Sequence, residues 1–266
     1  MKGYFSIFKM HFILELQYRA YAYSGILYQI FMGLISLMVY VAFYQGGGEL
    51  PMNFSQLATY IWLGQAFSLL VNLMFQDWDL ALMVRDGAVA YELVRPYNLY
   101  FFWFLRLMAG RISALTLRLF PVLFVAILLP EPYGLSAPQS LLSLILGILC
   151  LLLAFVLATA LSMVVYIMLF RVFAAQGPFT ILAAVSGFFS GALIPLPLMP
   201  DFMQRITALL PFRYLADFPF RVYMGMIPQN QALFGILIQA GWILLLMVPG
   251  FFLFQIASRK VSIQGG

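Results

Sequence analysis

Long apolar runs follow one another through most of this sequence, and their length leaves few folds open. Several runs reach or exceed the roughly 20 residues that a helix needs to cross a bilayer. Hydrophobic residues make up 64% of the chain and charged residues 9%, and the mean hydropathy is +0.99. No stretch between the runs is long enough for a soluble domain. We therefore predict an all-α polytopic membrane protein, with residues 1–266 forming a single transmembrane domain.

Six of the runs are predicted to span the membrane. They lie near residues 22–44, 54–75, 101–130, 141–170, 177–194 and 232–256. The third run begins somewhere between residues 101 and 112. The fourth is long enough to tilt or to protrude, whereas the fifth is short and stops at a proline cluster. Six crossings place both chain ends on the same side of the membrane.

The basic residues indicate which side this is, because cytoplasmic loops carry an excess of Lys and Arg. With the N-terminus inside, most basic residues fall on the inner side, and Arg118 falls within a span. The inner group is Lys2, Lys9, Arg19, Arg85, Arg95, Arg106, Arg111, Arg171, Arg259 and Lys260, and the outer group is Arg205, Arg213 and Arg221. Both termini are therefore predicted to be cytoplasmic. Since these residues flank the spans, they do not indicate a nucleic-acid partner.

Residues 1–20 are predicted to form an amphipathic helix along the cytoplasmic interface. Phe5, Phe8, Phe12 and Leu16 recur at helical spacing, and charged residues occupy other positions. A simple extension of the first span is the alternative.

A short charged segment, residues 76–100, joins the second and third spans on the inner side. Asp77 and Asp79 suit the first turn of a short helix, because their charge complements the helix dipole. Gly87 suits the C-terminal end of that helix. Arg95 precedes a proline and is therefore pushed toward an extended backbone. The segment lies where a cytoplasmic partner could press on it; an ordinary solvated loop is the alternative.

The outer segment, residues 195–230, is too apolar for a free loop and too often broken by proline for a span. Asp201 can cap a short helix that runs to Leu210. A second helical piece is predicted near residues 214–223. We expect a re-entrant or interfacial helical pair that enters the outer leaflet, where irregular backbone must be covered by protein or line a wet cavity. A stiff surface loop is the alternative.

Two features inside the spans stand out. Gly187 and Gly191 are four residues apart, as are Ser186 and Ser190. On a helix they would form a small face, suited to a subunit contact or to packing within the chain. Arg118 costs about 3 kcal/mol to place in a membrane and normally faces protein or water. Either it has a functional role, or it snorkels to the cytoplasmic surface from a span that begins late.

Several classes of activity lack the residues that they need. No Cys/His cluster has the spacing of a zinc site, and Cys150, inside an apolar run, is best read as a small core side chain. The single histidine, His11, lies in the N-terminal segment. No acidic pair sits within a span, which argues against an intramembrane metalloprotease or a proton relay. Gly46-Gly47-Gly48 lacks the lysine of a nucleotide-binding loop. We predict no metal, no cofactor and no catalytic residue in this chain.

The order of these elements resembles the membrane subunits of ATP-binding-cassette (ABC) exporters of the type-2 class. Two stretches carry the resemblance, which covers nearly the whole chain. The inner one is Arg85-Asp86-Gly87 followed by Glu92-Leu93-Val94-Arg95-Pro96. The outer one, which is more specific, includes Ser190-Gly191, Ile194-Pro195-Leu196, Leu210-Pro211-Phe212 and Phe218-Pro219.

The resemblance implies a permease subunit in the bacterial cytoplasmic membrane, surrounded by lipid. It would pair with a second permease subunit, identical or different, and with two ATPase subunits that bind ATP and Mg²⁺. A coupling helix over about residues 77–87 would take the push from the ATPase. The residues assigned to coupling are Asp77, Asp79, Arg85, Asp86, Gly87, Glu92 and Arg95. Candidates for lining the translocation path are Tyr28, Met32, Gln65, Asn72, Phe179 and Phe188, together with Arg118.

The predicted function is export of an apolar or amphipathic substrate (a drug, a lipid or a peptide) by alternating access. The 27 Phe, 15 Tyr and 15 Met residues favour such a cargo. A membrane immunity or sensor protein that sequesters an amphipathic peptide is one alternative, and it needs no ATPase. A passive carrier or lipid scramblase is another. An intramembrane enzyme ranks last, for want of catalytic residues.

Overall fold

In the computed structural model the chain folds into helices and connecting turns. The structure describes residues 9–13, 19–46, 51–73, 77–93, 96–172 and 176–259, and no strand occurs in these ranges. The all-α prediction is therefore confirmed for the described chain. Residues 9–13 are helical. The further helices are α2 (Arg19–Gln45), α3 (Phe54–Ala66), α4 (Ser68–Val71), α5 (Trp78–Arg85), α6 (Val89–Leu93), α7 (Leu99–Leu128), α8 (Leu141–Leu169), α9 (Gln176–Phe189), α10 (Asp201–Ala208), α11 (Asp217–Tyr223) and α12 (Gln229–Ser258), with short 3-10 turns η1 (Leu196–Leu198) and η2 (Pro211–Leu215).

Among the described residues, four helices are long and apolar enough to cross a membrane. They are Tyr23–Gln45 of α2 and the whole of α7, α8 and α12. These helices correspond to the first, third, fourth and last predicted spans. The chain is therefore a multi-pass membrane protein.

The second and fifth apolar runs form shorter helices. The second run is divided at Phe67 into α3, of 13 residues, and α4, of four. The 14-residue α9 is about 21 Å long at about 1.5 Å per residue, short of a hydrocarbon core of about 30 Å. The count of six crossings therefore stays a prediction.

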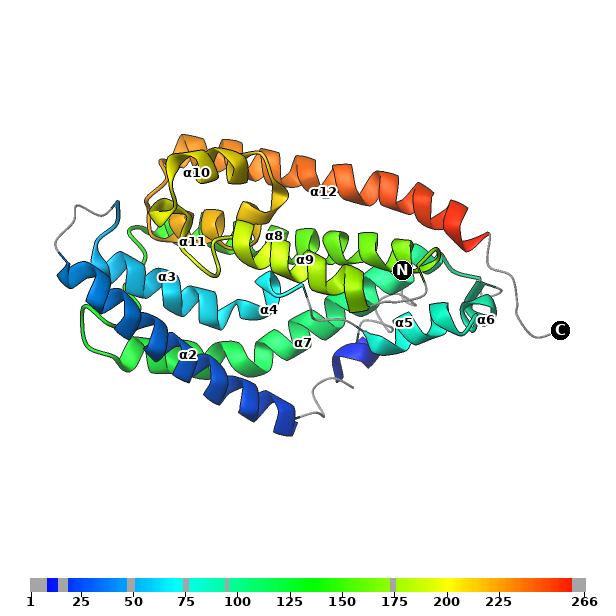
Figure 1. Cartoon of the computed structure of the whole chain (residues 1–266), viewed down its shortest axis with the longest axis horizontal. Coiled ribbons are helices and arrows are strands. Elements are labelled where there is room, and N and C mark those ends of the chain that lie inside the picture. Colours follow the sequence, from blue (N-terminus) through cyan, green and yellow to red (C-terminus); the bar gives the residue numbers. More distant parts are fainter. Residues whose placement is uncertain are drawn as a thin grey trace.

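The long helices run side by side between two ends of the molecule (Figure 1). α5 and α6 lie at one end, together with the C-terminal end of α12. α10 and α11 lie at the opposite end, near the start of α3. The charged segment that follows the second run and the proline-broken segment that follows the fifth are thus separated by the length of the helix bundle.

α8 is the central helix, and α2 lies at the edge. In the most apolar stretch of each helix, 44% of the α8 residues are buried, against 17% for α2. α8 packs against α7, α11 and α12. Its small residues, such as Ala154 and Ala158, are fully buried and let neighbouring helices approach closely.

The outer segment contains the two predicted helical pieces. α10 begins at Asp201 and ends at Ala208, two residues short of the predicted end, and its N-cap residue is Pro200 without a side-chain cap bond, so the predicted capping by Asp201 is wrong. The second piece, α11, begins at Asp217, later than predicted, because the 3-10 turn η2 occupies Pro211–Leu215. Phe218 of α11 is buried against α12, where a Cβ on Gly235 would overlap its ring. Whether this segment enters the outer leaflet stays a prediction.

The prediction that Gly187 and Gly191 share a small helical face is wrong. α9 ends at Phe189, so Gly191 lies beyond the helix, with a φ of +85° that disfavours any side chain. The chain turns here because the N–H of Asp217 donates to the carbonyl of Ser190, at 3.1 Å. The hydroxyl of Tyr60 also lies so close to Gly191 that a Cβ would overlap it. Gly191 therefore permits a tight turn instead of packing two helices.

We predict that Gly191→Ala lowers the free energy of unfolding by about 1–3 kcal/mol, the usual cost of a left-handed backbone at a residue with a side chain. The control is Gly187→Ala. It lies inside α9, where a Cβ meets no atom within 4 Å, and it should be neutral or stabilising by up to about 1 kcal/mol. Thermal unfolding in detergent measures both. Equal losses of unfolding free energy in the two variants would show that Gly187 and Gly191 do share a helical face.

Candidate functional site

The predicted short helix on the inner side is present as α5, and both of its ends are capped. Asp77 is the N-cap residue, and its Oδ1 accepts from the N–H of Leu80 at 3.2 Å. Asp79 in the first turn and Arg85 in the last turn both complement the helix dipole. Gly87 follows with a φ of +73°, and its N–H donates to the carbonyl of Val84 at 3.3 Å. A strong start and stop signal thus defines this eight-residue helix.

α5 is amphipathic. Leu80, Ala81 and Val84 are buried in a cluster that includes Trp103 of α7 and Phe254 of α12. Met83 is half-buried, and the opposite side exposes Trp78, Asp79, Leu82 and Arg85. One face therefore attaches the helix to the bundle, and the other is open to a partner.

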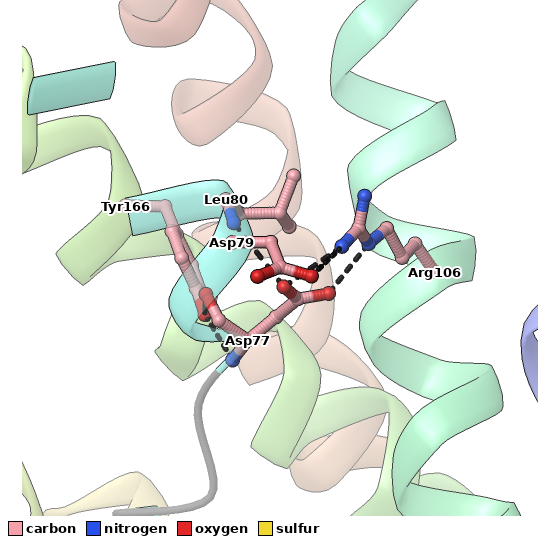
Figure 2. Close-up of polar contacts among 5 residues, drawn as sticks. All are labelled: Asp77, Asp79, Leu80, Arg106 and Tyr166. Carbon is pink, nitrogen blue, oxygen red and sulfur yellow. Dashed lines mark hydrogen bonds and ion pairs between the residues drawn. The ribbon is translucent and has the colours of Figure 1, made fainter. Parts of the chain in front are cut away.

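The N-cap residue of α5 is also held by α7. Arg106 donates from Nη2 to Oδ1 of Asp77 at 2.9 Å and from Nε to Oδ2 (Figure 2). This two-bond geometry fixes distance and angle together. The side chains of Arg106 and Asp77 are only 15% and 19% exposed. Asp79 lies 3.6 Å from Nη2 of Arg106 but is 81% exposed.

α8 also contacts Asp77, through the hydroxyl of Tyr166. The N–H of Asp77 donates to the hydroxyl of Tyr166 at 2.7 Å, and that hydroxyl donates to the carbonyl of Asp77 at 3.2 Å. Tyr166 is fully buried. The start of α5 is therefore joined to α7 through Arg106 and to α8 through Tyr166, as Figure 2 shows. We call these three residues the Asp77 node.

The remaining predicted coupling residues differ in their environment. Arg85 and Asp86 form an exposed ion pair, with Nε and Oδ1 2.8 Å apart. Glu92 of α6 faces its own chain, because the hydroxyl of Tyr97 donates to Oε2 of Glu92 at 2.6 Å. Arg95 lies outside the described residues.

The described part of the N-terminal segment rests on α7. The hydroxyl of Ser113 donates to the carbonyl of Phe12 at 3.0 Å, and the rings of His11 and Phe102 are in edge contact. Partial burial and the nearby positive charge of Arg106 lower the pKa of His11, against the opposing effect of Asp77. Residues 1–8 and 14–18 lie outside the described residues, so a continuous helix over residues 1–20 stays a prediction.

The predicted path-lining residues occupy several environments. Phe179 is fully buried, with its ring 5.1 Å from that of Tyr166, and it belongs to the core in this state. Tyr28 is exposed on α2 and Asn72 is exposed beyond α4, while three further candidates are half-buried. The half-buried ones are Met32, Gln65 and Phe188.

Arg118 lies inside the bundle. α7 begins early, at Leu99, and Arg118 is about two-thirds of the way along it and 7% exposed. Its guanidinium rests against α2 at Gly25, where a Cβ would overlap it. The alternative of snorkelling from a late-starting span is therefore wrong.

Sequence reasoning missed Arg111, which was counted among the residues flanking a span. It is fully buried, and it donates to the carbonyl of Leu69 at 3.0 Å and to the hydroxyl of Ser162 at 2.7 Å. Leu69 lies in the last turn of α4, where carbonyls have no donor within the helix. The burial of Arg111 could have been predicted from a start of the third span near Leu99, because a helix that begins there contains Arg111 well inside it.

A buried acidic residue at the opposite end was also missed. Asp217 is fully buried, 3.5 Å from Nη1 of Arg221. The hydroxyl of Tyr60 lies 3.4 Å from Asp217 Oδ1 and 3.1 Å from the carbonyl of Gly191. These contacts join α3 to the outer segment.

A cavity of about 600 Å³ lies at the same end, between α2 and the chain that follows α9. Its walls are mostly apolar, and Tyr40 is one of the few polar residues. The lining residues are Ile35, Ser36, Val39, Tyr40, Phe43, Tyr44, Pro51, Leu193, Ile194, Pro197 and Leu198. Its size is that of pockets that hold drug-sized ligands. Over the described ranges, no group of three His, Cys, Asp or Glu side chains could hold a metal ion.

Comparison with known proteins identifies a family. The family model described as ABC-2 family transporter protein matches residues 30–265. This range includes most of α2 and every later helix. No curated protein matches the chain, and no solved structure matches it.

We predict that Gly25→Leu lowers the Tm by several degrees, because the new side chain displaces the buried guanidinium of Arg118. Gly64→Leu is the control, since a Cβ at Gly64 of α3 meets no atom within 4 Å. The loss should shrink when Arg118→Met makes room, which is a non-additive result. Thermal unfolding of all four variants checks this. An unchanged loss in the Arg118→Met background contradicts the contact.

Proposed function

The chain belongs to the ABC-2 family of transporter proteins, and we propose that it is the permease subunit of an ATP-driven exporter. Membership makes it the transmembrane subunit of an ABC transporter and implies an ATPase partner. In this proposal a separate ATPase chain binds ATP and Mg²⁺. This subunit supplies the path through the membrane, together with a second permease subunit that is identical or different.

The exposed face of α5 is the proposed contact for the ATPase. The observation that carries this assignment is a doubly capped helix with one buried apolar face and one exposed charged face. Its charges are free to exchange partners, because the exposed pair of Arg85 and Asp86 contributes little in water. We therefore assign coupling to Asp79, Arg85 and Asp86, whereas Asp77 and Glu92 support the segment from within.

The α5 end of the bundle is proposed to be cytoplasmic, in a bacterial inner membrane. Arg85, Arg171 and Arg259 are exposed at this end, in keeping with the cytoplasmic excess of basic residues. The end with α10 and α11 would then face outward and cap the exit.

Six crossings are part of the proposal. α3 with α4, and later α9, lie beside the long helices and cover part of the length of the bundle (Figure 1). A short or broken helix can cross a membrane where protein covers its free backbone groups. The contact of Arg111 with the carbonyl of Leu69 supports this for the second crossing.

The proposed mechanism is alternating access. ATP binding closes the ATPase pair, the closure moves α5, and the spans change from inward-facing to outward-facing. ATP drives the change because it binds the two states unequally. An apolar or amphipathic substrate is supported by the mostly apolar cavity at the outer end.

We expect that reversing the exposed charges of α5, with Asp79→Lys, Arg85→Glu and Asp86→Lys combined, weakens binding of the ATPase by at least about tenfold. Membrane insertion should not change, and Tm should fall only slightly, because each exposed charge contributes at most about 1 kcal/mol through the helix dipole. The control is Arg205→Glu, an exposed basic residue on α10 at the opposite end. Co-purification of the ATPase with the tagged subunit measures the loss. Undiminished binding by the triple variant would remove α5 from the contact.

Vesicles that contain this subunit alone should show no uphill accumulation of a fluorescent amphipathic dye. Vesicles that also contain the ATPase and the second permease subunit should accumulate the dye when ATP is supplied. Accumulation without the ATPase would refute the proposal. A subunit that binds an amphipathic peptide but never an ATPase would instead support the immunity or sensor function.

A further inference from the structure

α5 is isolated from its neighbours along the chain. α4 ends at Val71, Asp77 has an extended backbone just before α5, and a left-handed glycine, Gly87, follows α5. Pro96 then precedes α7. In the described chain α5 is thus continuous with no long helix. Side-chain contacts with the spans give a displacement of α5 a direct route to them.

Two kinds of contact join α5 to the bundle. One kind is apolar and non-directional, and the other consists of directional hydrogen bonds. Leu80 and Val84 provide apolar contacts, which are non-directional and allow a helix to rotate or slide. The Asp77 node provides directional bonds, two from the Arg106 fork and two that involve the Tyr166 hydroxyl. The node therefore sets the orientation of α5 relative to both α7 and α8.

The node is sheltered from water. Arg106 and Asp77 are mostly buried, and Tyr166 is fully buried. A sheltered ion pair is screened less by salt than an exposed one, and removing one member leaves the other charge without its partner. The exposed pair of Arg85 and Asp86 lacks this property.

Further contacts extend from the node along the same helices. Ser162 lies one turn before Tyr166 on α8 and accepts from Arg111, which also holds the end of α4. On α7, Ser113 holds the carbonyl of Phe12. α7 thus contacts both the end of α4 and the start of α5, α8 joins it at both places, and α7 also contacts the N-terminal helix.

We infer that Arg106 and Tyr166 are positioning residues that transmit the movement of α5 to α7 and α8. The inference rests on the proposed function and deepens it, because it assigns the step between the ATPase contact and the spans. α5 then moves with α7 and α8 as one body. Without the node the ATPase still binds α5. The helix then rotates against the bundle, and α7 and α8 do not follow its movement.

The test uses the complete transporter, with its ATPase bound, and three variants. Asp77→Asn removes the charge but keeps an N-cap, because Asn caps a helix as well as Asp does. Arg106→Gln removes the fork, and Arg106→Lys keeps the charge without the two-bond geometry. The control is Arg171→Gln, an exposed arginine just after α8.

We expect Asp77→Asn and Arg106→Gln to bind the ATPase within about twofold of wild type but to transport at least about tenfold less substrate per ATP hydrolysed. Arg106→Lys should recover part of the loss, and Arg171→Gln should match wild type. Transport per ATP at the wild-type level in Asp77→Asn overturns the inference. If Arg106→Gln fails to fold, Asp77→Asn still tests the inference.

A spectroscopic distance separates positioning from general stability. The only cysteine is Cys150, so Cys150→Ala permits spin labels at Leu82→Cys on α5 and Val172→Cys just after α8. Both positions are exposed. The distance should be narrow and unaffected by ATP in the wild-type background, and broad in Asp77→Asn and Tyr166→Phe. Unchanged distributions in both variants overturn the inference.

This measurement also separates the two proposals. If no ATPase co-purifies with the wild-type subunit, the proposed function fails. The distance in the isolated subunit still reports whether the node orients α5. If the ATPase binds and drives transport while the node variants behave as wild type, only the inference fails.

Discussion

A positive charge inside a helix bundle needs oxygen atoms or close protein contact around it, because the apolar surroundings cannot solvate it. α7 carries three such charges. Arg106 meets Asp77 at the start of α5, Arg111 meets the end of α4 and a serine of α8, and Arg118 rests against α2 at Gly25. These contacts join α7 to α2, α4, α5 and α8, and the arrangement of the spans around α7 depends on them.

Contacts from buried polar side chains also explain how the bundle tolerates interruptions. The second apolar run is divided at Phe67, and the fifth ends in a turn at Gly191. Each interruption frees backbone groups that lipid cannot satisfy. Arg111 binds the carbonyl of Leu69, and the hydroxyl of Tyr60 lies 3.1 Å from the carbonyl of Gly191. Polar side chains are therefore buried where the chain departs from a continuous helix.

The two ends of the bundle differ in what they offer a partner. At the α10 and α11 end, Asp217 is fully buried and paired with Arg221, and that contact stays within the chain. At the α5 end, the buried node supports a helix whose outer charges are exposed. α10 also exposes charged residues, at Asp201 and Arg205, so the difference lies in the buried support beneath the exposed charges of α5, which suits a helix that a partner binds and pushes. This difference accords with a subunit of an ABC transporter.

By itself the sequence determined the class of the protein, four of its long helices and the short capped helix at Asp77. These follow from local signals, because apolar length, helix caps and a glycine stop act within a few residues. Only the tertiary structure decided that Asp77 faces inward, that Arg111 is buried, and that Gly191 belongs to a turn. Each of these outcomes depends on a partner far along the chain, such as Arg106, Leu69 or Tyr60. Periodicity and spacing report which residues share a face, but they do not report which distant atoms that face will meet.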